Sequence, residues 1–214
     1  MYIPKHFRVT DEIIIEQFIK ENGFATLISM GADHPIGTHI PVELEINSKG
    51  EKVLWGHISR ANLQWMEFER FPNVLIIFLS GIHHYISSSW YNHPNAPTWN
   101  YLSVHITGKI KLLEGDELWE SVRRLTNRYE KYSKNPVSLD NLPIGIQKQM
   151  KSIVGFEVSI DKTDAAFKIS QNRNKEDFGN IIKELRLSTS SVAKIMANIM
   201  EQSRSKAYRQ DEQL

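Results

Sequence analysis

The chain has 214 residues, a net charge of +1 and no cysteine. The absence of cysteine excludes disulfides, thiol nucleophiles, thiolate zinc sites and iron–sulfur clusters, and the small net charge gives no global attraction to nucleic acid or anionic lipid. The length suits one domain with an appendage. No apolar run is long enough to span a membrane, and no signal-peptide pattern is present, so we expect a cytoplasmic protein.

The apolar spacing predicts a helix near the N-terminus, followed mostly by strands. Thr10 is placed to cap this helix, and Asn22 with Gly23 to end it. Residues 62–70 predict a second helix, which Pro72 ends. The expected strands cover 24–29, 37–42, 53–58, 74–79, 102–112, 153–160 and 166–170, with turns at 31–35 and 47–50.

Residues 102–112 alternate between apolar and polar side chains, as in a strand with one buried face. Gly108 interrupts the apolar face and marks a bulge or a bend. Residues 116–132 predict an amphipathic helix, and the chain is expected to be helical from about 173. At least six strands with small helices at the joints predict a closed or nearly closed antiparallel barrel. We expect the barrel domain to cover 1–172 and a helical extension to cover 173–214.

Polar residues gather after the strand over 53–58. Ser59 offers a hydroxyl, Arg60 offers a planar set of donors that matches a phosphate, and free N–H groups begin the next helix. This corner is therefore a candidate anion site. The alternative is that Ser59 only caps the helix and Arg60 makes a surface ion pair.

Aromatic and histidine side chains are dense between His83 and Tyr101. Such a loop, stiffened by Pro94 and Pro97, suits either a pocket for a planar ligand or an interface with a second subunit. The histidines do not predict a metal site. His83 and His84 are adjacent on a strand and point to opposite faces, and the loop holds no acidic residue.

Two further segments have polar patterns of interest. Residues 167–173 place Gln171, Asn172 and Arg173 just after a strand, either as a donor set or as an ordinary turn. Residues 180–196 have the outline of a helix-turn-helix, but the net positive charge of the C-terminal segment is small. We therefore favour a helix pair packed on the barrel, and DNA binding has only weak support from the sequence.

These segments resemble the PaiB family of FMN-binding negative transcriptional regulators, the protease synthase and sporulation negative regulatory proteins. The resemblance covers the chain to about residue 185. It is carried by Met1-Tyr-Ile-Pro-Lys-His-Phe7, Thr38-His-Ile-Pro41, Gly56-His57, Arg60-Ala-Asn62, Gln64-Trp65, His84-Tyr-Ile-Ser87, Ser89-Trp-Tyr91, Pro97-Thr-Trp-Asn-Tyr101, Ile153-Val-Gly-Phe156 and Lys168-Ile-Ser-Gln-Asn-Arg173.

The resemblance implies the FMN-binding split β-barrel, the fold of pyridoxamine-phosphate oxidases, in a homodimer with flavin at the subunit interface. The strand 37–42 and the corner 57–62 match the side that holds the phosphate and ribityl chain, and the loop 87–101 matches the opposing wall. The implied flavin contacts are Thr38, His39, His57, Ser59, Arg60, Asn62, Ser89, Trp90 and Trp99.

The function implied is a flavin-binding repressor of degradative-enzyme and sporulation genes, with FMN or another planar small molecule as its ligand. Two alternatives remain, a flavin-dependent oxidoreductase and a haem-binding split barrel. The sequence lacks the G-x-S-x-G, P-loop, G-x-G-x-x-G and H-E-x-x-H motifs, which argues against the common hydrolases, P-loop NTPases, Rossmann enzymes and zincins.

Overall fold

The computed structural model describes residues 1–211, with side chains to residue 203, and divides into two compact units. Unit 1 comprises Met1–Ile15, Leu79–Val104 and the chain from Asp164 onward, and unit 2 comprises Glu16–Phe78 and His105–Thr163. Residues 212–214 of the expected extension lie outside the described residues. Within 1–211, no helix is both long and apolar enough to cross a membrane.

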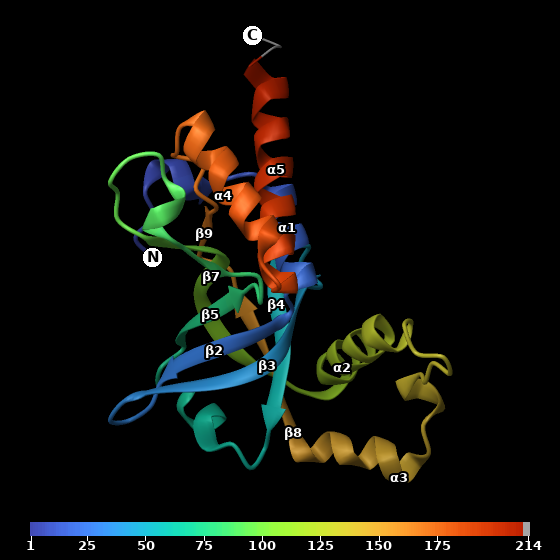
Figure 1. Cartoon of the computed structure of the whole chain (residues 1–214). Coiled ribbons are helices and arrows are strands. Elements are labelled where there is room, and N and C mark those ends of the chain that lie inside the picture. Colours follow the sequence, from blue (N-terminus) through green and yellow to red (C-terminus); the bar gives the residue numbers. More distant parts are fainter. Residues whose placement is uncertain (212–214) are drawn as a thin grey trace. The chain divides into compact units, whose positions relative to one another are not determined.

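Unit 2 is a closed antiparallel barrel of six strands (Figure 1). The strand order is β7–β5–β2–β3–β4–β8, and β8 pairs back with β7 to close the ring. The predicted split β-barrel is confirmed. Its strands are β2 (Phe24–Met30), β3 (Pro35–Ile46), β4 (Lys52–Ser59), β5 (Asn73–Leu79), the second part of β7 (Thr98–Leu113) and β8 (Ile153–Ser159).

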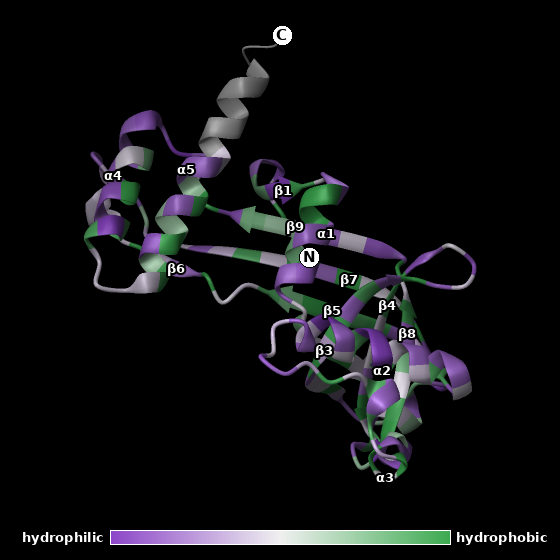
Figure 2. Ribbon diagram, turned by 90° about the vertical axis from the view of Figure 1, so that its right-hand side faces the viewer, coloured by the Kyte–Doolittle hydropathy of each residue, from purple (hydrophilic) through white to green (hydrophobic). Residues whose placement is uncertain are grey.

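Successive side chains of each strand point alternately into and out of the barrel, and the inward ones fill its interior. Hydrophobic residues therefore recur along the barrel strands in Figure 2. The ring of Phe156 lies edge-on to Phe68, with centroids 6.3 Å apart. Gly56 leaves room for this ring, because a Cβ there would lie 2.5 Å from the ring of Phe156. The fully buried side chains of this core are Leu27, Leu54, Phe68, Ile76, Phe78, Ile106, Phe156 and Val158.

Gly108 lies where β7 passes the end of β8. A Cβ at this position would lie 1.6 Å from the carbonyl oxygen of Ser159. The neighbouring backbone is bonded on both sides, since Asp161 N donates to Thr107 O at 3.0 Å and Lys109 N donates to Ser159 Oγ at 3.2 Å. The glycine predicted to mark a bulge or bend is therefore a site of close backbone approach.

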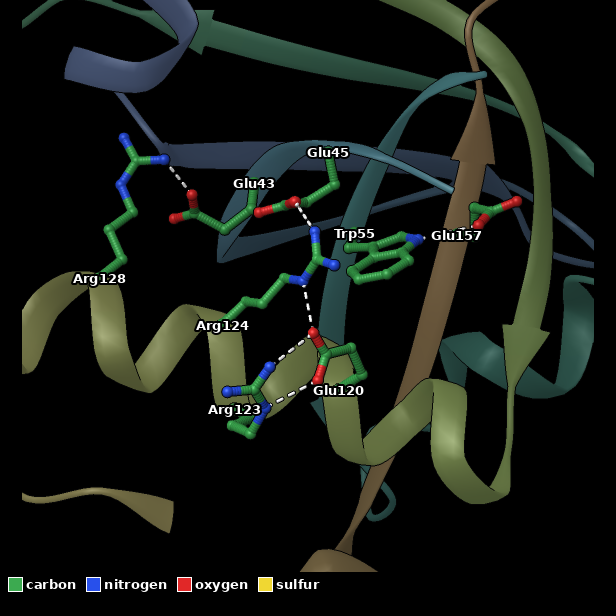
Figure 3. Close-up of polar contacts among 8 residues, drawn as sticks. All are labelled: Glu43, Glu45, Trp55, Glu120, Arg123, Arg124, Arg128 and Glu157. Atoms are coloured by element: carbon green, nitrogen blue, oxygen red, sulfur yellow. Dashed lines mark hydrogen bonds and ion pairs between the residues drawn. The ribbon is translucent and has the colours of Figure 1, made fainter. Parts of the chain in front are cut away.

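Helix α2 (Gly115–Glu130) covers the outer face of β3, β4 and β8 in unit 2 (Figure 3). Leu118 packs against the buried cluster Val53, Trp55 and Leu113. Basic residues one turn apart on α2 reach acidic residues on β3: Arg124 Nη1 lies 2.5 Å from Glu45 Oε2, and Arg128 pairs with Glu43. The predicted amphipathic helix is thus attached by a small apolar contact and by ion pairs.

The remaining helical segments of unit 2 are short. The helix expected over 62–70 is a 3-10 turn, η2 (Leu63–Glu67), followed by a bend that buries Phe68. Burial of this ring in the barrel core outweighs continuation of a regular helix. After α2 come η4 (Leu139–Asn141), α3 (Ile144–Gln147) and η5 (Lys148–Ser152).

Unit 1 is built around the first part of β7. The short strand β6 (His84–Ile86) pairs with it, and β9 (Lys162–Lys168) pairs with β1 (Arg8–Val9). Helix α1 (Glu12–Glu21) is capped by Asp11 and not by the predicted Thr10, because Asp11 Oδ1 accepts from Ile13 N at 2.9 Å and from Ile14 N at 3.2 Å. The other short turns of this unit are η1 (Lys5–Phe7) and η3 (Ser88–Trp90).

The C-terminal extension begins with two helices, α4 (Lys175–Leu187) and α5 (Ser191–Asp211). The predicted helical tail is confirmed. The segment 188–190 separates the two helices, within the range 180–196 that has the outline of a helix-turn-helix. Direct DNA binding by this pair stays a prediction. The two helices pack on each other, and their buried side chains include Ile181, Leu185, Ala193, Met196 and Met200.

Candidate functional site

The corner after β4 is a tight turn held by its own side chains. Asn62 N donates to Ser59 O at 2.9 Å and closes the turn. Asn62 then caps η2, because its Oδ1 accepts from Gln64 N at 3.1 Å. Ser59 Oγ accepts from Ala61 N at 3.2 Å, and Ser59 is exposed, so its hydroxyl can still donate to a ligand. The structure therefore makes Asn62, and not Ser59, the cap of η2, and Ser59 stabilises the turn that precedes it.

Gln64 organises one end of the barrel. Its side chain is 1% exposed, accepts from Thr38 Oγ1 at 2.6 Å, and donates to Ser29 Oγ at 2.9 Å and to Ile36 O at 3.1 Å. Asn62 Nδ2 also donates to Thr38 Oγ1, at 2.9 Å. Thr38 and Asn62, two of the predicted flavin contacts, are thus brought together in a network within the protein. Gln64 was not among the predicted site residues.

Arg60 joins the corner to the start of β8. Its Nε donates to Lys151 O at 2.9 Å and its Nη2 to Ile153 O at 3.2 Å. The guanidinium also lies 5.5 Å from the centroid of Trp65, whose indole nitrogen donates to Arg60 O at 3.1 Å. One terminal nitrogen, Nη1, has no partner among the described residues, so Arg60 is positioned by the protein and keeps donors for an anion.

A groove of about 510 Å³ runs beside Arg60. Arg60 and Lys151 supply its positive charges, and Glu114 its negative charge. A groove of this size with a mainly apolar lining and a few charged groups is typical of a small-molecule site. Its apolar lining comes from Trp65, Leu112, Leu113, Leu118, Trp119, Met150 and Val154.

The two predicted histidines of unit 2 lie on different strands. His39 is exposed on β3, and its Nδ1 lies 2.9 Å from Thr26 Oγ1 on β2. It points away from its neighbour Thr38, because adjacent strand residues face opposite sides. His57 lies on β4, partly buried, and burial lowers the pKa of its imidazole below the usual 6.5, which favours the neutral ring at pH 7.

The aromatic loop in unit 1 is ordered by stacking and by short-range hydrogen bonds. Trp90 stacks on His84 with centroids 6.4 Å apart. Trp99 on β7 is the cross-strand partner of Tyr85 on β6, and the two rings lie edge-on with centroids 6.0 Å apart. The indole nitrogen of Trp99 donates to His83 Nδ1 at 3.3 Å. Trp99 and Tyr85 are 48% and 46% exposed, so unit 1 presents an open aromatic surface.

Ser89 begins this loop rather than contacting the aromatic pair. Its backbone N donates to Ser87 Oγ at 3.2 Å, and the two hydroxyls lie 2.9 Å apart. Ser89, Trp90 and Trp99 therefore belong to unit 1, whereas the other six predicted contacts belong to unit 2. Their roles as flavin contacts stay predictions. Within the described residues, no group of three or more histidine, aspartate or glutamate side chains is placed to hold a metal ion.

Comparison with known proteins places this fold and these residues in context. Residues 1–162 match a family model described as "Putative FMN-binding domain". The chain is 44% identical over 203 residues to the Bacillus subtilis (strain 168) protein named "Protease synthase and sporulation protein PAI 2", an alignment that covers 94% of this chain and 97% of that protein.

Two solved structures share the fold at low sequence identity. The flavocytochrome Anf3 from Azotobacter vinelandii superposes with a TM-score of 0.61 at 16% identity, covering 83% of this chain and 78% of that one. The FAD and heme binding protein from Mycobacterium smegmatis superposes with a TM-score of 0.60 at 14% identity, covering 80% and 78%. The family match and the B. subtilis relative both span most of the chain, so it belongs to this FMN-binding domain family.

Proposed function

We propose that the chain is a dimeric, flavin-binding transcriptional regulator that lowers the expression of degradative-enzyme and sporulation genes. The regulatory part is supported by the B. subtilis relative, whose name refers to protease synthase and sporulation and which matches almost end to end. The ligand is supported by the FMN-binding family model. The observation that carries the proposal is the corner around Arg60, which offers exposed donors beside a groove.

The donor set of the corner fits the phosphate end of FMN. Arg60 is held by two carbonyl oxygens and keeps Nη1, and Ser59 keeps a hydroxyl hydrogen. Thr38 and Asn62 already bond each other and Gln64, so they would shape the corner more than contact the ligand. When bound, the flavin would supply a redox-active ring, and the protein would hold and orient it.

The exposed pair Tyr85 and Trp99 fits the role of a wall for the ring. Two flat side chains that are about half exposed are costly to leave in water and match the faces of a planar ligand or of a second subunit. In the proposed dimer, the corner of one subunit holds the phosphate and the aromatic loop of the other covers the ring.

Ligand binding is tested by comparing FMN with riboflavin, which lacks the phosphate. Arg60→Gln should lower the affinity for FMN by about 10- to 100-fold, which corresponds to the loss of one charged hydrogen bond, and should leave the affinity for riboflavin unchanged. Trp99→Ala should lower the affinity for both flavins. The matched control is Arg70→Gln, an exposed arginine that lies over the Phe71 ring. Equal losses for both flavins in Arg60→Gln would mean that Arg60 acts only through the corner's structure.

Dimerisation and regulation need separate measurements. Light scattering of the purified full chain should give twice the monomer mass, and a monomer with and without FMN would contradict the proposed interface. Expression of the chain in B. subtilis that lacks its PAI 2 protein should restore secreted-protease levels and spore counts to those of the parent. Failure to complement, with the protein present at normal abundance, would remove the regulatory part.

A further inference from the structure

Two cations flank a fixed turn in unit 1. Lys168 ends β9, and Arg173 closes the turn that follows, since Arg173 N donates to Ser170 O at 3.0 Å. Ser170 adopts φ 61°, a left-handed conformation that non-glycine residues rarely adopt. Its hydroxyl donates to Asn100 Oδ1 on β7 at 3.0 Å, and both residues are buried. The turn is therefore fixed to β7 through Ser170, and Arg173 is held at its end.

Neither cation is neutralised by the chain. Lys168 Nζ donates to the neutral hydroxyl of Thr98 at 2.6 Å, and the Arg173 guanidinium lies 4.6 Å from the centroid of the Tyr91 ring. No carboxylate lies within ion-pair distance of either side chain among the described residues. Burial and the nearby Arg173 lower the pKa of Lys168, as expected for like charges that share a site.

The first buried carboxylate after this turn is already used. Asp177, at the start of α4, accepts from Asn92 N at 2.9 Å and from Asn174 Nδ2 at 2.9 Å, and its Oδ2 lies 3.4 Å from His93 Nδ1. These bonds fix the residue after Tyr91 to α4 and leave the positive charge of Arg173 uncompensated.

Two buried donors in the same place lack partners. Tyr91 is 8% exposed, and its hydroxyl has no hydrogen-bond partner in the described part of the chain. The buried Nε of Arg173 also has none there. Buried polar groups in native proteins are almost always bonded, so a pair of orphaned donors beside two cations points to an acceptor that the chain itself does not supply.

We propose that Lys168, Arg173 and Tyr91 form a binding site for a phosphate group. A phosphate supplies several acceptor oxygens and negative charge, which matches the two cations and the orphaned donors. The site lies in unit 1, apart in sequence from the Arg60 corner of unit 2. The inference does not rest on flavin binding, because inorganic phosphate, a phosphorylated metabolite and the phosphate of FMN share this chemistry.

The test measures the melting temperature of the full chain in potassium phosphate against potassium chloride at equal ionic strength. Phosphate at about a hundred times its Kd should raise the Tm of the wild type by about 5–10 °C. Lys168→Gln and Arg173→Gln should abolish the rise. Tyr91→Phe keeps the ring and removes only the orphaned hydroxyl, so it should fold normally and show a smaller rise.

The control is Lys183→Gln, an exposed lysine on α4 with the same change of net charge, which should keep the full phosphate response. A response that is absent in the wild type, or equal in all folded variants, overturns the proposal. If Arg173→Gln does not fold, Lys168→Gln and Tyr91→Phe decide the question.

FMN and riboflavin identify the source of the phosphate. FMN should then raise the Tm of the wild type more than riboflavin does. If Lys168→Gln removes this difference in Tm and Arg60→Gln does not, the Lys168 site binds the flavin phosphate. If Arg60→Gln alone removes the difference but inorganic phosphate still needs Lys168, the two sites are separate and both proposals stand.

Discussion

The indole nitrogen of Trp55 on β4 donates to the Glu157 carboxylate on β8 at 2.8 Å, directly across the ladder. Glu157 is 5% exposed and also lies 3.2 Å from Lys111 Nζ, while Arg124 of α2 lies over the Trp55 ring at 5.3 Å. One hydrogen bond therefore links two barrel strands beneath the ion pairs of α2 (Figure 3).

Trp55→Phe removes this donor while keeping an aromatic ring. We expect a loss of about 1–3 kcal/mol in the free energy of unfolding, because a buried carboxylate loses one partner and keeps Lys111. Urea unfolding measures it. The control is Trp119→Phe, whose indole has no hydrogen bond among the described residues, and an equal loss there would show that ring size, not the hydrogen bond, matters.

Gln64→Leu should destabilise the barrel by about 2–4 kcal/mol, since it removes the buried amide that hydrogen-bonds Ser29, Thr38 and the carbonyl of Ile36. The matched change Gln17→Leu is on the exposed face of α1 and should alter stability by less than about 0.5 kcal/mol. Denaturant unfolding of both variants provides the comparison. Similar small effects at both positions would contradict the organising role of Gln64.

Glu43 gives a pH dependence with a definite sign. Burial raises the pKa of its carboxyl above the ordinary 4.5 and outweighs the pairing with Arg128. The folded state thus holds this proton more tightly than the unfolded state, so the contribution of Glu43 is fully present below pH 4.5 and is lost as pH rises through the folded pKa. Relative to Glu43→Gln, the wild type should lose stability over that window in urea unfolding.

The contrast is Glu120 on α2, where hydrogen bonds from Arg123 and Arg124 lower the pKa to about 2. Its contribution is present above the ordinary 4.5 and is lost as pH falls toward about 2. The Glu120 side chain is 31% exposed, so solvent screening keeps the effect small. Wild type and Glu120→Gln should therefore converge on acidification, and divergence would reverse the assigned sign.

Much of the barrel is readable from the sequence, because apolar and polar residues alternate wherever one strand face is buried. The start of β7 is the exception. Thr98 to Asn100 follow Pro94 and Pro97 and look like loop residues, yet they pair with the three-residue strand β6. Pairing between short segments depends on tertiary position, which local pattern does not contain.

The candidate site divides in the same way. Ser59 and Arg60 stand out as donors after a strand, but the residue that caps the following turn is Asn62 and not Ser59. The role of Gln64 cannot be predicted from local sequence, because its partners Ser29, Ile36 and Thr38 lie 26 to 35 residues away in the chain. Tyr91 reads as one aromatic among many, and only the fold shows that its hydroxyl is buried without a partner.

Gly108→Ala should prevent the barrel from closing, since even a methyl group would overlap the carbonyl of Ser159. Little folded protein should accumulate, as measured by soluble yield and circular dichroism. The corresponding change at Gly81, where a Cβ meets no atom within 4 Å, should leave the yield unchanged.

This crowding at Gly108 has a genetic consequence. Every missense codon at that position should behave as a null allele through loss of protein, whatever the ligand or target gene. A strain with a Gly108 substitution therefore shows the phenotype of missing protein, with which the phenotypes of Arg60, Trp99 or Lys168 alleles can be compared. An allele that matches the null phenotype at normal protein abundance has lost a function, not the fold.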